Sequence, residues 1–266
     1  MEFFGSSPTI RSSPAANRWI AYSQIAIEIN RAQDVCQLLN EPSRIRGSTS
    51  EAISFADLGN RAQFAGEIEV AQTWYRSALA IASEIGDMEL IATCLGNLSI
   101  GYRAQGDYAQ ALNARHQASA LFKELGNESG IADSFNNLGI IYHSLGNLPL
   151  ALESYQRAVN LFEHLGDKHG IASTTANISI FWRQKGAYHK ARLNHDQAVK
   201  AYEELHDIQG VARCLCNLAQ LFRDRGETSE AIGQFQQALA VFELVGDKQG
   251  RRTCSEQIDA ISHGRI

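Results

Sequence analysis

The sequence has no apolar run long enough to cross a bilayer, no surplus of positive charge and no paired cysteine spacing. A transmembrane helix needs roughly 18 consecutive apolar residues, and the start Met1-Glu2-Phe3-Phe4-Gly5 lacks the basic flank and apolar stretch of a secretory signal. The net charge is -5, so the basic face of a general nucleic-acid binder is not expected. The odd number of cysteines, 5, fits a reducing compartment. We therefore expect a cytoplasmic protein that neither inserts into membranes nor binds nucleic acid.

Glycine recurs in a register of 40 residues. One series is Gly66, Gly106, Gly146, Gly186 and Gly226, and a second, offset by twenty, is Gly86, Gly126, Gly166 and Gly246, with His206 in the remaining place. Glycine just beyond a helix adopts the left-handed conformation that ends it. The second series is followed by the N-cap residues Asp87, Asn127, Asp167, Asp207 and Asp247. Each half period therefore predicts one helix.

Small and large residues alternate in the same register. The small positions are Ala71, Ala111, Ala151, Ala191 and Ala231, then Ala78, Ala118, Ala158, Ala198 and Ala238. Leu98, Leu138 and Leu218 each stand four residues before an aromatic residue, which places each pair on one helical face. Helices with such stripes cannot bury their apolar faces alone, so we expect neighbouring hairpins to stack into one continuous core.

The segment Asn137-Leu138-Gly139-Ile140-Ile141-Tyr142, followed by Gly146, Ala151 and Ala158, resembles the tetratricopeptide repeat in its 40-residue form. That form is found in kinesin light chain, in spindle-orientation adaptors with Leu-Gly-Asn repeats and in bacterial regulatory ATPases. The resemblance implies an all-α, right-handed superhelical solenoid of antiparallel helix hairpins. It covers residues 48–262, as five hairpins and a C-terminal capping helix.

Four residues depart from the repeat. Ala62 replaces the aromatic residue of the other units. Arg115 and His195 occupy a position where Tyr75 and Tyr155 stand in other units, and His206 interrupts a glycine series. We expect locally loosened packing at these places, within the same fold.

The resemblance implies that the first helix of each hairpin lines a concave groove that binds peptides. One groove position carries asparagine in four units, namely Asn97, Asn137, Asn177 and Asn217. Similar arrays use this asparagine to hold the main chain of an extended peptide, and an amide can donate and accept at once. The alternative is that these side chains bridge adjacent helices within the array.

Two further groove positions suggest the chemistry of the partner. Three residues after the asparagines stand Ile100, Ile140 and Ile180, an expected apolar floor, and three residues further stand Arg103, His143, Arg183 and Arg223. Arginine pairs bidentately with carboxylates, so this basic rim favours an acidic, amphipathic peptide segment. A solvated helix face is the alternative reading.

A carboxylate-clamp version of the family is not indicated. The residues four before the asparagine position include one arginine, Arg213, and no lysine, and Asp133 would repel a carboxylate. Arg213 stays a candidate groove residue.

No pattern indicates catalysis, a metal or a cofactor. There is no His-Glu-x-x-His pair, and the glycines end helices instead of forming a phosphate loop. Cys214 and Cys216 point to different faces of one helix, and Cys94, Cys214 and Cys254 share a repeat position that suits small packing residues. We predict a non-enzymatic adaptor that binds a protein or peptide. The alternative is a regulatory sensor that responds to a peptide or small molecule.

The residues before the array predict three segments. Residues 1–16 are rich in Ser and Pro and predict a mobile end. Residues 17–42 have an apolar stripe at helical spacing and predict an amphipathic helix, followed by a linker over residues 43–50. This helix would cap the array, or occupy the groove of its own chain or of a second chain by self-association.

Overall fold

The computed structural model describes residues 48–264, and every regular element in that range is an α-helix. The predicted segments 1–16 and 17–42 and residues 43–47 of the linker lie outside the described residues, whereas Thr49 and Ser50 already belong to the first described helix. The helices are α2 (Thr49–Phe64), α3 (Ile68–Ile85), α4 (Met88–Ala104), α5 (Tyr108–Glu124), α6 (Glu128–Ser144), α7 (Leu148–Leu165), α8 (Lys168–Gln184), α9 (Tyr188–Glu204), α10 (Ile208–Asp224), α11 (Thr228–Val245) and α12 (Lys248–Ser262).

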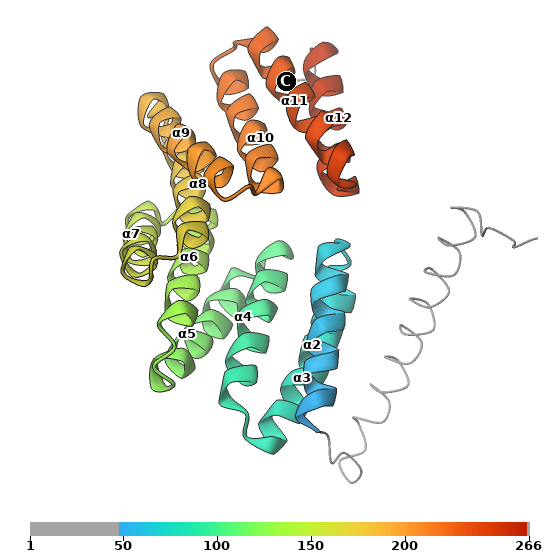
Figure 1. The fold of residues 1–266 in the computed structure, drawn as a ribbon, viewed down its shortest axis with the longest axis vertical. Helices are drawn as coiled ribbons and strands as arrows, with labels where there is room; N and C mark the ends of the chain where they lie inside the picture. The colour runs from blue at the N-terminus through green and yellow to red at the C-terminus, as the bar shows by residue number, and fades with distance from the viewer. Residues whose placement is uncertain (1–47, 265–266) are drawn as a thin grey trace, which may run out of the picture.

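Consecutive helices pair into hairpins, α2 with α3 through α10 with α11, and α12 packs on the last hairpin. The hairpins stack along a curved path in which α4, α6, α8 and α10 lie towards the inside, while α5, α7 and α9 lie outside (Figure 1). Successive first helices also contact one another, as α6 contacts α8 and α8 contacts α10. The predicted all-α solenoid is confirmed, and its inner surface is formed by the first helices.

The predicted helix ends are present. Each glycine of the two series has a positive φ, from 66° at Gly126 to 81° at Gly66. All five predicted N-cap side chains accept a hydrogen bond from the backbone N–H three residues later, as Asp207 does from Gly210 at 2.8 Å. His206 holds the left-handed conformation with φ 55°, although it carries a Cβ. The turn geometry is therefore the same with histidine as with glycine.

Glycines inside the first helices make room for aromatic rings of the preceding helix. A Cβ built on Gly170 would lie 2.3 Å from a ring carbon of Phe162, and one on Gly210 would lie 2.3 Å from Tyr202. The alanine series is buried throughout, with Ala78, Ala118, Ala158, Ala198 and Ala238 fully inaccessible. These small residues set the close approach of the helices, and large rings fill the remaining space.

The expectation of loosened packing at Arg115 and His195 was wrong. Arg115 is 4% exposed and His195 is 3% exposed, so both are as buried as the tyrosines they replace. In the tyrosine units, a Cβ on Gly59 or Gly139 would collide with the ring of Tyr75 or Tyr155. In the Arg115 unit, Ser99 stands at the position of Gly59 and Gly139. The Ser99 hydroxyl accepts a hydrogen bond from the Arg115 guanidinium.

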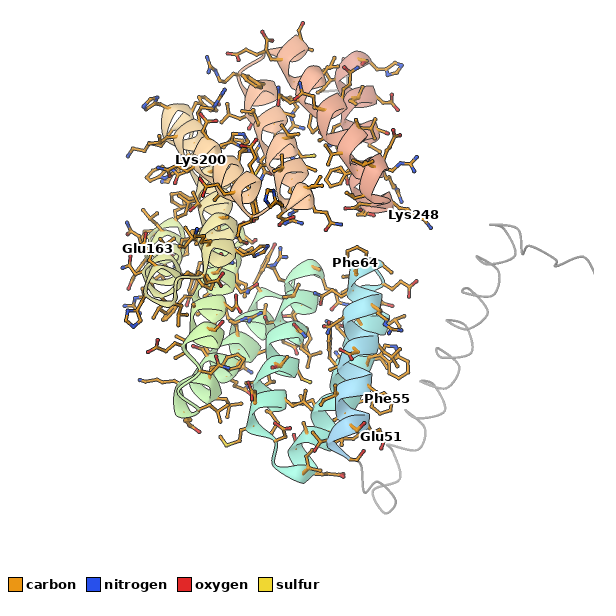
Figure 2. The ribbon with its side chains drawn as sticks, viewed as in Figure 1. Glu51, Phe55, Phe64, Glu163, Lys200 and Lys248 are labelled. Carbon is orange, nitrogen blue, oxygen red and sulfur yellow. The ribbon has the colours of Figure 1, made fainter. Side chains whose placement is uncertain are left out.

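Glu163 on α7 and Lys200 on α9 are exposed on the outer layer of the array (Figure 2).

Candidate functional site

The predicted groove residues lie on four consecutive first helices. Helix α4 carries Asn97, Ile100 and Arg103; α6 carries Asn137, Ile140 and His143; α8 carries Asn177, Ile180 and Arg183; and α10 carries Arg213, Asn217 and Arg223. Arg213 is exposed and the other eleven are partly buried. These four helices form the inner layer of the array (Figure 1).

Two hollows open between successive first helices. The N-terminal hollow, about 210 Å³, lies between α4 and α6, and its lining includes Thr93, Asn97, Ile100, Arg115, Asp133 and Asn137. The C-terminal hollow, about 410 Å³, lies between α8, α10 and α12, and its lining includes Asn177, Ile180, Tyr202, Arg213, Cys216, Asn217 and Phe242. The C-terminal hollow covers the place in the repeat that the N-terminal hollow occupies and extends further, to α12, and each hollow is flanked by two asparagines of the predicted ladder.

The asparagine amides are partly used within the array. Asn97 donates to Asn60 Oδ1 at 3.3 Å and so joins α4 to α2, and Asn177 donates to Asn136 Oδ1 at 3.0 Å and joins α8 to α6. Asn137 instead donates to the carbonyl of Asp133 in its own helix at 2.9 Å. Two of the four therefore bridge helices, which was the alternative reading, while all four also line a hollow. An amide that makes one such bond keeps further donor and acceptor capacity.

Two of the three arginines of the predicted rim contact a carboxylate of the array itself. Arg183 Nη1 lies 2.9 Å from Asp224 Oδ2, and Arg223 Nη2 lies 3.5 Å from Asp224 Oδ1. The Arg183 side chain is only 10% exposed, and burial lowers the pKa of its guanidinium. Asp224 therefore offsets part of the positive charge that the sequence places here. Within residues 48–264, Arg103 forms no salt bridge, so its charge is the least compensated of the three.

His143 stands at the same position as these arginines. Burial lowers the pKa of its imidazole below the ordinary value, and the charge of Arg183 acts in the same direction. Its ring lies 5.6 Å from that of Phe181. The surroundings of this position therefore disfavour a further positive charge on the rim.

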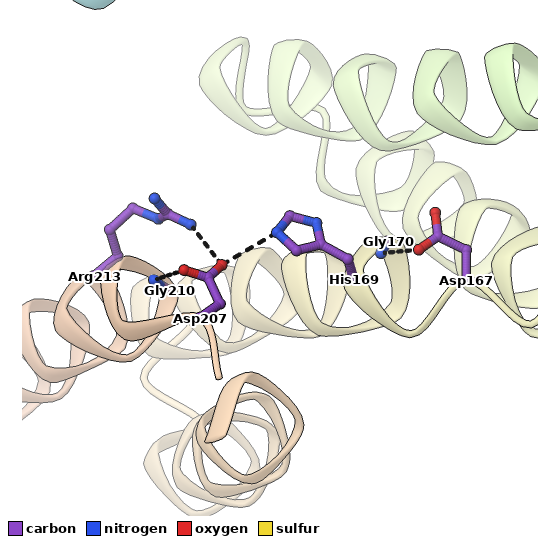
Figure 3. A network of polar contacts seen from close by, with 6 residues as sticks. All are labelled: Asp167, His169, Gly170, Asp207, Gly210 and Arg213. Atoms are coloured by element: carbon purple, nitrogen blue, oxygen red, sulfur yellow. Dashed lines mark hydrogen bonds and ion pairs between the residues drawn. The ribbon is translucent and has the colours of Figure 1, made fainter. Parts of the chain in front are cut away.

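Arg213 belongs to a polar network that joins the starts of α8 and α10 (Figure 3). Asp207 caps Gly210, lies 3.2 Å from Nε2 of His169 and pairs with Arg213 at 3.8 Å. The Arg213 guanidinium also lies 5.9 Å from the Tyr202 ring centroid. These contacts hold Arg213 at the edge of the C-terminal hollow, where its side chain remains 54% exposed.

Arg115 is the site residue that sequence reasoning missed. It reaches from α5 between the first helices, where Nε donates to Ser99 Oγ at 2.9 Å and Nη2 donates to the carbonyl of Gly96. Burial lowers the pKa of its guanidinium to about 10, so it stays charged at neutral pH. The signal was present, because arginine replaces tyrosine at one repeat position and serine replaces glycine at its partner.

Within residues 48–264, no group of three or more His, Cys, Asp or Glu side chains is arranged to hold a metal ion. None of the helices in that range is both long and apolar enough to cross a membrane.

A model of the tetratricopeptide repeat matches the chain in four overlapping windows, residues 50–124, 90–164, 130–204 and 170–243. The chain belongs to the tetratricopeptide repeat family. The windows are offset by 40 residues, which is the register of the glycines and asparagines.

Solved structures share the fold of this tetratricopeptide repeat protein. A Rap protein complexed with competence and sporulation factor has a TM-score of 0.62 and 13% identity, over 92% of this chain and 72% of that chain. BtubC (BKLC) from P. vanneervenii has a TM-score of 0.59 and 20% identity, over 84% and 90%. A putative kinesin light chain of Podosopora anserina, with nearly identical TPR-like repeats, has a TM-score of 0.54 and 17% identity, over 76% and 99%. At these identities the similarity shows the fold. A search of curated proteins finds no match.

Proposed function

We propose that this protein is a non-enzymatic adaptor that binds an extended segment of a partner protein along its inner surface. The observation that carries the proposal is the pair of hollows at equivalent repeat positions, each flanked by two asparagines and opening beside an isoleucine. An extended chain that crosses successive first helices would meet an amide in each unit, which suits recognition of main-chain groups. Proteins that act this way need no catalytic or metal centre, and we expect this one to act in the cytoplasm.

The two hollows predict different side chains in the bound segment. The C-terminal hollow has the larger volume, and the rings of Tyr202 and Phe242 contribute to its wall. We propose that it takes a large apolar side chain of the ligand. The N-terminal hollow contains the buried guanidinium of Arg115 and the carboxylate of Asp133, so it favours a polar group that can both accept and donate hydrogen bonds.

The preference for acidic segments depends on how far Asp224 compensates the charges of Arg183 and Arg223. Because Asp224 contacts both Arg183 and Arg223, we expect Asp224→Asn to strengthen binding of an acidic segment and Arg183→Glu/Arg223→Glu to weaken it. If neither variant changes affinity or its salt dependence, the acidic preference is wrong, and the rim is a solvated face.

The direct test compares capture of partners from native lysate by the wild-type chain and by Asn137→Ala/Asn177→Ala. A matched control is Asn113→Ala/Asn160→Ala, which removes two exposed asparagines from the outer helices α5 and α7. A captured partner is then mapped to a peptide, and its affinity is measured by calorimetry. We expect at least a tenfold loss for the inner pair, about 1.4 kcal/mol, and no loss for the outer pair. Equal binding by both double variants, with unchanged helicity, would contradict inner-surface binding.

A regulatory sensor is the second candidate. The Rap protein that shares this fold was solved with competence and sporulation factor bound, and a similar array can change curvature when a ligand enters. Small-angle scattering of the free and ligand-bound chain distinguishes the two, since a sensor changes its radius of gyration and an adaptor does not.

A further inference from the structure

Two cysteines, one on α10 and one on α12, lie in contact between these helices. Sγ of Cys216 on α10 lies 3.2 Å from Sγ of Cys254 on α12, although the residues are 38 apart in the sequence. Cys254 is fully buried, whereas Cys216 is partly exposed and lines the C-terminal hollow. The other described cysteines, Cys94 and Cys214, are buried. One thiol of the pair is therefore open to small molecules, and the other is shielded behind it.

The repeat explains why these two side chains meet. Cys216 occupies the place where Asn136 stands in the third hairpin, and the Asn136 side chain also contacts the next first helix, through Asn177. This position therefore faces the following first helix. Cys254 lies at the small packing position of α12, as Cys94 and Cys214 do in their own helices.

We propose that Cys216 and Cys254 form an oxidation site, in which hydrogen peroxide converts the two thiols into a disulfide that links α10 to α12. The bond length of a disulfide, about 2.0 Å, requires the sulfurs to approach by about 1 Å, which side-chain rotation can supply. The inference rests on the contact between the two thiols and does not depend on the proposed function.

The chemistry proceeds in two balanced steps. The Cys216 thiolate attacks one peroxide oxygen, the O–O bond breaks, and the leaving oxygen takes up protons as water, which leaves a sulfenic acid on Cys216. Cys254 then attacks that sulfur, the S–O bond breaks, and a second water leaves with the Cys254 proton. The thiols lose two electrons and two protons, and the peroxide is reduced to two waters.

The environment predicts a slow reaction at neutral pH. Burial raises the pKa of Cys216, with added contributions from Cys254, Asp247 and Cys214, and burial also raises the pKa of Cys254. Because the thiolate is the reacting form and these raised pKa values keep its fraction low, the pair is oxidised under sustained exposure to peroxide.

A disulfide here would change the C-terminal hollow directly. Its wall includes Arg213 and Asn217 from α10 and Gly250 and Thr253 from α12. A covalent link between these helices fixes the width of the hollow, so oxidation would change what it accepts.

The test treats the full chain with hydrogen peroxide, alkylates free thiols under denaturing conditions, and identifies cross-linked peptides by mass spectrometry. We expect loss of two alkylatable thiols, a linked peptide pair containing Cys216 and Cys254, and recovery of both thiols with dithiothreitol. Cys254→Ser should lose the link and retain a sulfenic acid on Cys216 that dimedone traps. The Cys94→Ser/Cys214→Ser control should keep the link.

The wild-type result decides the proposal even if a variant fails to fold. Recovery of Cys216 as a free thiol, a sulfinic acid or a sulfonic acid, without the linked peptide, would overturn it. A disulfide of Cys216 with Cys36 or between two chains would overturn it equally.

Discussion

The two hollows of the inner surface occupy the same place in the repeat and differ in what reaches them. In the N-terminal hollow, Arg115 extends over Gly96 and places a buried charge beside Asn97 and Asn137. In the C-terminal hollow, Ala176 stands at the position equivalent to Gly96, and the wall extends to Cys216, Phe242 and α12. Exchanges at single repeat positions therefore decide whether a buried guanidinium reaches a hollow, while a charged side chain lines both hollows, Asp133 in one and Arg213 in the other.

Among the variants that test this comparison, removal of the Arg115 side chain should change the free energy of unfolding most. Arg115→Ala leaves a cavity and deprives Ser99 and the Gly96 carbonyl of their partner, so we expect a loss of about 3 kcal/mol of unfolding free energy. Urea denaturation followed by circular dichroism measures it. Arg157→Ala on the outer helix α7, whose side chain is 58% exposed, should cost far less. Similar midpoints for the two variants would show that the buried guanidinium is not structural.

His195 tests the same repeat position nearer the C-terminal hollow. Burial lowers the pKa of its imidazole to about 4, below the ordinary 6.5, so the unfolded chain binds the proton more readily. The contribution of His195 to stability is then fully present above pH 6.5 and is lost as the pH falls towards 4. The loss is about 2 kcal/mol between pH 7 and pH 5.

The comparison variant for that measurement is His195→Phe, since Phe235 occupies the equivalent place in the next hairpin and is fully buried. Denaturation midpoints at several pH values should fall more steeply for the wild-type chain than for the variant. If the midpoints of the two proteins change in parallel with pH, His195 does not contribute to the loss of stability at low pH.

Exchanging Arg115 and Ser99 for the residues of the other units should show that these two positions are energetically coupled. Arg115→Tyr alone would force the ring against Ser99, because a Cβ at the equivalent Gly139 lies 2.5 Å from the Tyr155 ring. Adding Ser99→Gly should recover at least about 1 kcal/mol of the loss. A double-mutant cycle by urea denaturation measures this coupling, and additive effects would contradict the pairing.

The smallest expected effect is a gain in stability from a substitution at the turn before α10. His206 holds φ 55° at a place where the other units have glycine, so His206→Gly should stabilise the chain by about 1 kcal/mol. Thermal denaturation measures it, with the exposed His164→Gly on α7 as a control that should destabilise, because glycine is unfavourable inside a helix. A lower melting temperature for the His206→Gly variant would indicate that contacts of the imidazole stabilise the chain by more than the backbone strain destabilises it.

Much of the fold could be predicted because it depends on local chemistry repeated in register. Gly166 ends α7 and Asp167 starts α8 through hydrogen bonds within a few residues, which sequence spacing reveals. The candidate site was only partly predictable. The repeat placed Asn137 and Asn177 on the inner surface, but their present partners, Asp133 in the same helix and Asn136 on another, depend on side-chain positions in the folded array.

The sequence by itself determined the helices, their ends, their pairing into hairpins and the surface that the asparagines share, since each follows from interactions between near neighbours or from a fixed period. Only the tertiary structure decided that Asp224 contacts Arg183 and Arg223, that Arg115 reaches the N-terminal hollow, and that Cys216 meets Cys254. The Arg183–Asp224 and Cys216–Cys254 contacts join helices of different hairpins, and Arg115 crosses between the two helices of its own hairpin, so all three depend on how helices pack and not on the period alone. A repeat pattern shows which positions are equivalent, but it does not show which side chains of different units touch.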